Sequence, residues 1–430
     1  MSRTRVANSG QLSLIPSQLG FWLREDHPAR FFDEFVENHL DLSTFRSSSP
    51  DRRGRPAYDQ GMLVKLILYG YSLGLTSGRE IADACHDRID FRFLSGGLQP
   101  TYRTISNFRK NNLAAFAKLF EQVLENSVDA GLVAMKAVAF DGTKVLANAS
   151  KRKAMSYERM SVELQKVHEV LSALKAEKKS APKRKQKSLE KEINFKKERL
   201  AKIQTAKIAL EERIMEEKGQ VPEPKDQRNF TDPESRIMKK GSGFEQCYNA
   251  QAAVDKSSQI IVAAFTTQAC NDKQMLEPLV RETLKNIGVL PDTGLADAGF
   301  FAEATIKLLS SMFPGTNWLV PPEKKQDPVA VRGRIPKNIS IADRMRRALS
   351  TKVGKAAYSQ RKAIVEPVFG QIKEAGVEFR RFSFRGFMNA DLEWLLVCSV
   401  HNMLKLMRLW QRSKTKKRLV KARPEHMAAA

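Results

Sequence analysis

The chain has 430 residues, 42% of them hydrophobic, and this length predicts two or three domains that can each bury a core. Lys and Arg number 73 against 48 Asp and Glu, and the formal charge of +25 indicates a polyanionic partner: DNA, RNA or an anionic membrane surface. No apolar run approaches the roughly 20 residues of a membrane span, and Met1 to Gln18 lack a secretory pattern, so a nucleic acid is favoured and a membrane is excluded.

The sequence contains four cysteines, and none of them forms a C-x-x-C pair. They are Cys85, Cys247, Cys270 and Cys398. This usage favours free thiols in a reducing compartment over disulfides or a zinc site, so we expect a cytoplasmic protein. The final residues, His426 to Ala430, resemble a cloning remnant and are left out of the fold prediction.

Residues 1–130 predict an all-α domain. Apolar residues recur there at helical spacing, at Met62, Leu63, Leu66, Ile67 and Tyr69. Ser77, with Glu80 three residues later, has the spacing of a capping box and predicts the start of the next helix.

A further helix is predicted to begin at Thr101, with Ile105 and Phe108 on its apolar side. Its opposite side is polar and basic, and carries Arg103, Asn107 and Lys110. A basic second helix after a turn is typical of a helix-turn-helix element that enters the DNA major groove. A helical bundle with a solvated face gives the same pattern, and the sequence leaves both interpretations open.

Residues 131–410 predict an α/β domain with one long helical interruption. Ala137 to Phe140 form a short apolar strand that ends in Asp141. Residues 151–220 are rich in Lys and Glu, and two apolar stripes flank Ser180-Ala181-Pro182. This pattern predicts an inserted antiparallel helical hairpin, as a coiled coil. A solvated structural arm and a DNA-contacting arm both fit it.

Beyond the hairpin, strands and helices alternate. After a loop-like segment at 222–240, we expect strands at 247–255 and 259–267 joined by a hairpin turn, a helix at 272–287, a strand at 294–296, a helix at 302–312 and a strand at 317–320. A basic connector follows to about residue 354, then helix-forming sequence from Lys355 and a basic tail at 411–430. An antiparallel start followed by alternating elements is an α/β layered design, and the order matches a ribonuclease H-like domain.

Three carboxylates stand out in this order. Asp141 and Asp297 each follow an apolar strand, and ligands of open α/β sheets bind at the carboxyl ends of strands. Glu366 lies on a predicted helix, on a face that would turn it toward the aspartates. That face also carries Tyr358, Lys362 and Lys373.

Clustered carboxylates suit Mg²⁺ or Mn²⁺. Two such ions can hold the attacking and the leaving oxygen of a phosphoryl displacement, so no covalent protein nucleophile is needed. Taken singly, each residue has a structural alternative. An Asp at a strand end is typical of a turn, and Glu366 has the spacing of an i,i+4 ion pair with Lys362.

Several sequence blocks, in order along most of the chain, resemble the DDE transposases of bacterial insertion sequences, particularly the groups numbered five and eleven-eighty-two. The blocks are Lys65 to Tyr71 with Thr101 to Arg109, Asp141 to Lys144 with Asn148 to Ser150, Tyr248 to Gln251 with Asn271 to Lys273, Leu295 to Phe300, and Val365 to Lys373. Five blocks in the family's order make a specific match.

The family pattern near the glutamate is Tyr, two residues, Arg, three residues, Glu, six residues, Lys. Glu366 and Lys373 fit this spacing. Lys362 fills the Arg slot with Arg361 beside it, and the Tyr slot holds a serine with Tyr358 one place early. The resemblance therefore carries Glu366 and Lys373 over more firmly than the Tyr and Arg roles. Pro367 would kink a helix at this point.

The resemblance implies an enzyme that cleaves transposon-end DNA and joins the 3′-hydroxyl to target DNA, with Asp141, Asp297 and Glu366 holding Mg²⁺ or Mn²⁺, as two ions. Its partners would be double-stranded terminal inverted repeats and target DNA, with the enzyme a homodimer on DNA, in the bacterial cytoplasm at the nucleoid. Arg361, Lys362 and Lys373 would contact DNA phosphates. Two alternatives remain: a metal-dependent nuclease of the same fold that does not join strands, and a non-catalytic DNA-binding protein derived from a transposase.

Overall fold

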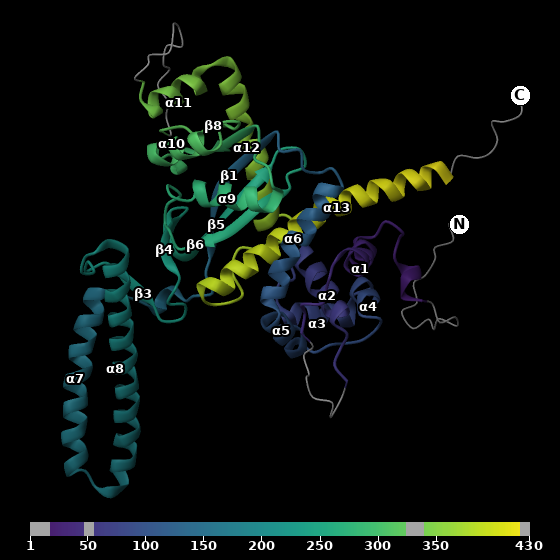
Figure 1. Cartoon of the computed structure of the whole chain (residues 1–430). Helices are drawn as coiled ribbons and strands as arrows, with labels where there is room; N and C mark the ends of the chain where they lie inside the picture. Colours follow the sequence, from purple (N-terminus) through teal and green to yellow (C-terminus); the bar gives the residue numbers. More distant parts are fainter. Residues whose placement is uncertain (1–17, 47–55, 324–338, 422–430) are drawn as a thin grey trace, which may run out of the picture. The chain divides into compact units, whose positions relative to one another are not determined.

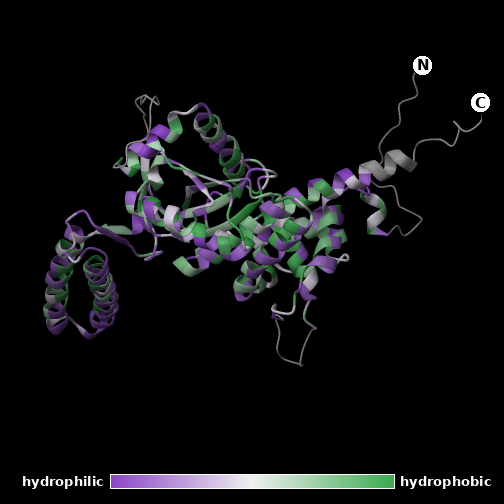
Figure 2. Cartoon of the chain, turned by 45° about the horizontal axis from the view of Figure 1, so that its top comes forward, coloured by the Kyte–Doolittle hydropathy of each residue, from purple (hydrophilic) through white to green (hydrophobic). Residues whose placement is uncertain are grey.

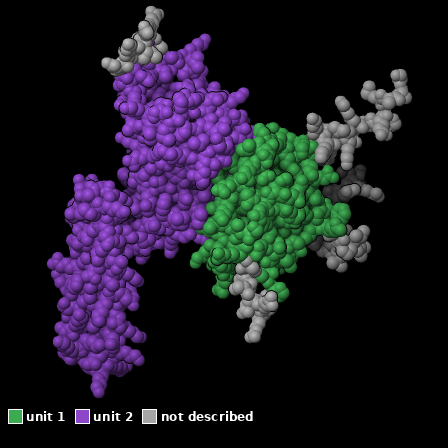
Figure 3. Space-filling view, viewed as in Figure 1, with its two compact units in different colours: residues 1–131, 399–430 green, residues 132–398 purple. Residues whose placement is uncertain are grey.

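The structure is a computed structural model that describes residues 18–46, 56–323 and 339–421. The chain divides into two compact units (Figure 3): residues 1–131 with 399–430, and residues 132–398. The expected basic tail at 411–430 therefore groups with the N-terminal helices, and the last helix, α13 (Phe387–Lys421), runs through residue 399, where the two units divide. The ends of that tail and of the connector, residues 422–430 and 324–338, lie outside the described residues.

The first unit is helical, as the sequence predicts (Figure 1). Its elements are η1 (Leu19–Trp22), α1 (Pro28–His39), α2 (Gln60–Ser72), α3 (Gly78–Asp87), α4 (Ile89–Leu94), α5 (Tyr102–Asn111) and α6 (Leu113–Asp129). The capping box predicted at Ser77 and Glu80 is confirmed at the start of α3. The apolar spacing of α2 is also confirmed, since nearly all of that helix is buried.

Helices α3 and α5 pack closely because Gly78 has no side chain. A Cβ atom at Gly78 would lie 2.2 Å from the Ser106 hydroxyl. Ile105 and Phe108 of α5 are buried, whereas Arg103, Asn107 and Lys110 are exposed. The polar stripe expected on this helix therefore faces solvent.

The second unit is built on a six-stranded sheet. The strands are β1 (Ala137–Leu146), β4 (Arg236–Lys240), β5 (Gly243–Asp255), β6 (Ile261–Thr267), β7 (Thr293–Ala296) and β8 (Asn317–Leu319), in the order β4-β5-β1-β7-β8 with β6 also on β5. β1 pairs antiparallel with β5, while β7 pairs parallel with both β1 and β8. The predicted hairpin of β5 and β6 is confirmed.

Strand β1 is longer than the sequence pattern indicates. We expected it to end at Asp141, but it continues to Leu146 because β5 supplies antiparallel partners along that whole stretch. The sequence predicts a loop at 222–240, but part of it forms the strand β4. This strand forms because it pairs with the N-terminal half of β5 at the edge of the sheet.

Helices pack on this sheet and against one another. They are η3 (Ala298–Phe300), α9 (Leu276–Ile287), α10 (Glu303–Met312), α11 (Ile341–Ser350) and α12 (Lys352–Lys373). α11 lies in the expected basic connector, and its buried residues are Met345 and Leu349. Among the described residues, no helix is long and apolar enough to cross a membrane.

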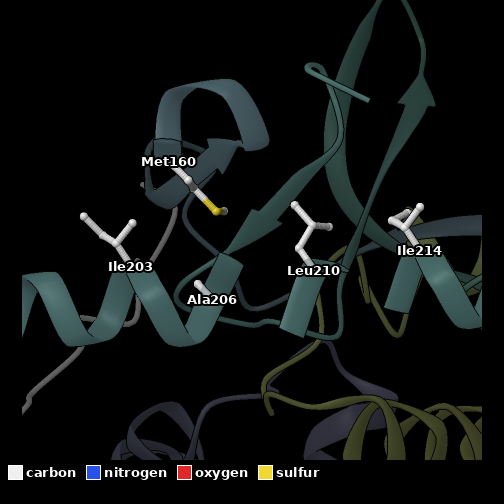
Figure 4. Close-up of a cluster of buried hydrophobic side chains, with 5 residues drawn as sticks. All are labelled: Met160, Ile203, Ala206, Leu210 and Ile214. Atoms are coloured by element: carbon white, nitrogen blue, oxygen red, sulfur yellow. The ribbon is translucent and has the colours of Figure 1, made fainter. Parts of the chain in front are cut away.

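A two-helix hairpin projects between β1 and β5 in the sequence (Figure 1). It consists of α7 (Tyr157–Ser180) and α8 (Lys183–Lys218), and a small sheet of β2 (Ala154–Ser156) and β3 (Gln227–Asn229) with η2 (Lys151–Lys153) forms its base. Hydrophilic residues dominate both helices (Figure 2). Apolar clusters hold the helices together, and the one nearest the base is Met160, Ile203, Ala206, Leu210 and Ile214 (Figure 4).

Candidate active site

Asp141 and Asp297 lie beside each other on neighbouring strands. The parallel pairing of β1 with β7 ends at Phe140 and Ala296, so the two aspartates are the next residues in register. Neighbouring strands lie roughly 4.8 Å apart, which brings the two carboxylates within reach of a common ligand. The convergence expected from the sequence is therefore present for these two residues.

Asp141 is a half-buried carboxylate with two internal partners. One oxygen accepts a 2.8 Å hydrogen bond from the Arg361 guanidinium, and the other accepts a 2.9 Å bond from the Gly142 amide. Burial raises the pKa of Asp141 to about 6, repulsion by Asp297 adds to the rise, and Arg361 and the amide oppose it. The negative charge of this carboxylate therefore remains costly even with Arg361 in contact with it.

Asp297 is fixed by the turn that follows β7. Its side chain caps η3 by accepting a 2.7 Å hydrogen bond from the Gly299 amide. A Cβ atom at residue 299 would lie 2.9 Å from that same carboxylate oxygen, so glycine gives the carboxylate its room. This turn chemistry orients the second aspartate at the edge where β7 ends.

Helix α12 packs on β1 and presents Arg361 to the aspartates. The Arg361 side chain is only 11% exposed, and the neighbouring Lys362 is exposed. Tyr358, one turn earlier, lies close to Arg361, and burial raises the pKa of its hydroxyl. The Tyr and Arg that face the site are thus Tyr358 and Arg361, each one place before the slot that the family spacing assigns.

Lys373, at the end of the same helix, contacts β1 beyond the aspartates. Its ammonium donates to the Thr143 hydroxyl and, at 3.4 Å, to the Lys144 carbonyl. Burial and the nearby Lys240 lower its pKa to about 8. Lys373 therefore places a positive charge a short way along β1 from Asp141.

Glu366 is on α12 but does not join the pair of aspartates. It is exposed, and five residues of helix turn it roughly 140° away from Arg361. In the described parts of the chain, no group of three or more Asp, Glu, His or Cys side chains is arranged to hold a metal ion. The structure thus unites two of the three expected carboxylates, with Arg361 in contact with the first.

A polar cluster lies behind β1, on the face opposite Asp141. Asn249 and Gln251 each donate a 2.7 Å hydrogen bond to the same Asp272 oxygen. A Cβ atom at Gly142 would lie 2.5 Å from the Gln251 amide nitrogen and 2.7 Å from Asp272. Sequence blocks at these residues stand out by resemblance alone, because nothing in their spacing indicates that they meet behind the first aspartate.

The two aspartates fit a divalent cation as a pair of oxygen ligands. Hard cations such as Mg²⁺ bind through one or two carboxylates together with substrate phosphates and water. The mutual repulsion of Asp141 and Asp297 is what a cation between them would relieve. This pair of carboxylates therefore suits such an ion. Glu366, the expected third carboxylate, does not lie beside them.

The chain matches two protein-family models. Residues 17–111 match the model described as "Transposase domain (DUF772)", and residues 217–403 match the one described as "Transposase DDE domain". Both matched regions therefore have the sequence pattern of transposase domains, and the two matches together support a DDE transposase of the insertion-sequence type. Asp297, Arg361 and Glu366 lie inside the second match, whereas Asp141 lies in neither. A search of curated proteins and of solved structures finds no match.

Proposed function

We propose that this transposase cleaves transposon-end DNA and joins the freed 3′-hydroxyl to target DNA by phosphoryl transfer assisted by two Mg²⁺ or Mn²⁺ ions. The observation that carries the proposal is the register of Asp141 and Asp297 on adjacent parallel strands beside Arg361. Two carboxylates side by side on neighbouring strands, with a basic helix beside them, suit a metal-bound, anionic substrate.

The proposed catalytic domain, residues 131–410, is ribonuclease H-like, and it is interrupted by a coiled-coil hairpin at 151–220. In support, an antiparallel start (β4, β5, β1) is followed by the parallel strands β7 and β8 with helices between them. Residues 1–130 form the proposed DNA-binding domain and 411–430 a basic tail. The proposed relatives are insertion-sequence groups five and eleven-eighty-two.

The reaction has two displacements. In the first, a water oxygen attacks the phosphorus at the transposon end, the bond to the 3′-oxygen breaks, and that oxygen leaves as a hydroxyl. In the second, this hydroxyl attacks a target phosphorus and displaces the target's own 3′-oxygen. Asp141 and Asp297 would hold a divalent ion, which would supply Lewis-acid stabilisation of the attacking and leaving oxygens. Arg361 and Lys373 orient the phosphate.

Glu366 is the proposed third ligand, and it reaches the aspartates through a local change in α12. Pro367 cannot donate to the Ala363 carbonyl, and the Gln259 side chain donates to that carbonyl instead, at 3.2 Å. The helix therefore lacks one of its own hydrogen bonds at this turn. A rotation there, with DNA drawing Arg361 from Asp141 onto a phosphate, would bring Glu366 toward the two aspartates, where it would complete the set of carboxylates that could hold the ion.

The DNA contacts divide into two kinds. Arg361, Lys362 and Lys373 hold phosphates near the aspartates, which positions the duplex without reading its sequence. Arg103, Asn107 and Lys110 on α5 read the terminal inverted repeats from the major groove. The protein acts as a homodimer on double-stranded end and target DNA, in the bacterial cytoplasm at the nucleoid.

One assay separates this proposal from its alternatives. End DNA labelled at its 5′-terminus is incubated with the protein, Mg²⁺ or Mn²⁺ and an unlabelled target plasmid. We expect a nicked end product and then a larger joined product, both of which EDTA abolishes. Nicking without joining would identify a nuclease, and binding without metal-dependent nicking would identify a non-catalytic DNA-binding protein.

A further inference from the structure

The base of the helical hairpin carries a basic groove that the proposed reaction does not use. Two adjoining hollows of about 370 Å³ and 790 Å³ meet there and share Lys153, Lys202 and Phe230. We call this surface the shoulder groove, and the side chains that matter in it are Lys153, Arg159, Phe195, Lys202, Arg228 and Arg385. All of them lie in the second compact unit.

Of the cations that line the shoulder groove, Arg199 pairs with Glu163, and most of the others form no ion pair within the described residues. Among the described residues, no ion pair involves Lys153, Arg159 or Lys202, and Glu198 is the only carboxylate that lines either hollow. Near the tip of the same hairpin, Lys178 and Lys185 pair with glutamates, while Lys183, Arg184 and Lys187 form no ion pair among the described residues. The shoulder groove differs from the tip because its unpaired cations line a hollow, and a hollow lined by cations suits a phosphate backbone.

An aromatic ring lies among these cations. Phe195, on α8, is 63% exposed and lines the smaller hollow, although residues of the same helix close by pack into the apolar interior of the hairpin. An exposed phenyl ring offers an aromatic face on which a base can stack. Bases within a duplex are stacked on each other, so a ring of this kind gains a contact only from an unpaired base.

An apolar cluster supports the groove, and one edge of the groove is tied to the chain just after the strand that carries Asp141. The apolar cluster of Met160, Ile203 and Leu210 fixes α8 against α7 beneath it (Figure 4). Arg385 donates a 3.3 Å hydrogen bond to the carbonyl of Asn148, only seven residues along the chain from Asp141. Such a segment spans at most about 25 Å, less than one turn of duplex DNA.

We propose that the shoulder groove binds an unpaired stretch of DNA strand, with its phosphates held by Lys153, Arg159, Lys202 and Arg385 and one base stacked on Phe195. The inference rests on the proposed function only for its choice of DNA as the polyanion. It assigns the hairpin a direct role in holding a frayed or cleaved DNA end beside the aspartates.

The test compares affinities in EDTA, where no cleavage occurs, for a blunt duplex and for the same duplex with a single-stranded extension. The shoulder variant is Lys153→Ala/Arg159→Ala/Lys202→Ala. The control is Lys183→Ala/Arg184→Ala/Lys187→Ala, which removes the same charge from exposed residues at the hairpin tip. We expect the shoulder variant to bind the extended duplex more weakly and to lower the salt slope by about 2, while the tip variant binds like the wild type.

A second pair of variants tests the stacking. We expect Phe195→Ala to lower the preference for the extended over the blunt duplex by about tenfold. Phe244→Ala, at a comparably exposed ring on β5, should leave that preference unchanged. Thermal unfolding checks that all four variants fold. Equal losses from shoulder and tip, or an unchanged preference in Phe195→Ala, would overturn the proposal.

These outcomes are distinguishable from a failure of the proposed function. If the Asp141→Asn and Asp297→Asn variants still cleave DNA, the assignment of the aspartates fails while binding at the shoulder groove stands. If they do not cleave, but the shoulder variant binds both DNAs like the wild type, only the shoulder groove fails.

Discussion

Arg361 balances the buried charge of Asp141 from within the chain, in the position where a cation would act. The guanidinium contacts one carboxylate oxygen at 2.8 Å, and both side chains are largely buried. A metal ion that binds this carboxylate must compete with the guanidinium. The contact of Arg361 with Asp141 therefore belongs to the protein without metal or DNA, and we expect a bound metal ion or DNA phosphate to break it.

The first prediction concerns that competition. Arg361→Gln should raise the affinity of the DNA-free protein for Mn²⁺ several-fold, because the competing positive charge is gone. Lys362→Gln removes the same charge from the exposed neighbour and should leave the affinity near that of the wild type. Isothermal titration at pH 8 measures both. Weaker Mn²⁺ binding in Arg361→Gln than in Lys362→Gln would show that Arg361 supports the site instead of competing for it.

The second prediction concerns pH. The pKa of Asp141 is raised to about 6 in the metal-free protein, chiefly by burial. Below that pH the carboxyl is protonated and cannot ligate a cation, and above it the charged form is available. Affinity for Mn²⁺ should therefore fall by up to about tenfold per pH unit below pH 6 and level off above it. In Asp141→Asn this inflection should disappear, and an inflection that persists there would assign the titration to another group.

At the scale of elements, α12 brings together a tyrosine and two basic residues of the site. Tyr358, Arg361 and Lys373 all lie on its side toward β1. The spacing of this segment predicted the helix and the presence of Lys373 on it. It did not predict which of two adjacent basic residues faces the aspartates, because the ion pair of Arg361 with Asp141 joins residues 220 positions apart.

The other differences from the sequence prediction have similar causes. The end of β1 depends on its partner β5, which lies about a hundred residues later in the chain. α11 is short and basic. Its helix could not be predicted from its own sequence, because its buried residues show their role only in contact with neighbouring elements. Apolar strands, helix caps and the aspartates that follow apolar runs are local signals and were predictable, whereas pairings across the insertion, which carry β1 past Asp141, were not.

The third prediction concerns α5. Arg103 and Asn107 are exposed on one stripe, and their side chains suit bidentate contacts to guanine and adenine edges. Arg103→Ala or Asn107→Ala should reduce the preference for end DNA over scrambled DNA by about 1–3 kcal/mol each. Lys118→Ala, an exposed cation on α6, should leave it unchanged. Competition binding with both duplexes decides the matter, and an unchanged ratio in both α5 variants would place end recognition elsewhere.

At the scale of the whole molecule, the excess of 73 basic over 48 acidic residues is the dominant feature. It is spread over α5, α12, the shoulder groove and the C-terminal residues, and it favours binding to any DNA. Such binding releases counterions, so it does not distinguish sequences and it weakens with salt.

The fourth prediction follows from that charge. Affinity for any duplex should fall steeply between about 50 and 200 mM salt, by roughly a thousandfold or more if six or more phosphates are contacted. Deletion of residues 414–423 should weaken binding to end and scrambled DNA about equally. Anisotropy titrations over a salt series measure both effects. A salt-independent affinity would contradict a phosphate-binding surface.

The central claim is that Asp141 and Asp297, with Glu366, hold the ion that cleaves transposon-end DNA. The most direct measurement is single-turnover cleavage of end DNA in Mg²⁺ by Asp141→Asn, Asp297→Asn and Glu366→Gln, with DNA affinity measured alongside. The control is Asp292→Asn, an exposed aspartate just before β7. We predict no detectable cleavage by the three variants, wild-type cleavage by the control and retained DNA affinity in all four. Near wild-type cleavage by any one of the three variants would show that its residue does not hold the ion, and would contradict the account.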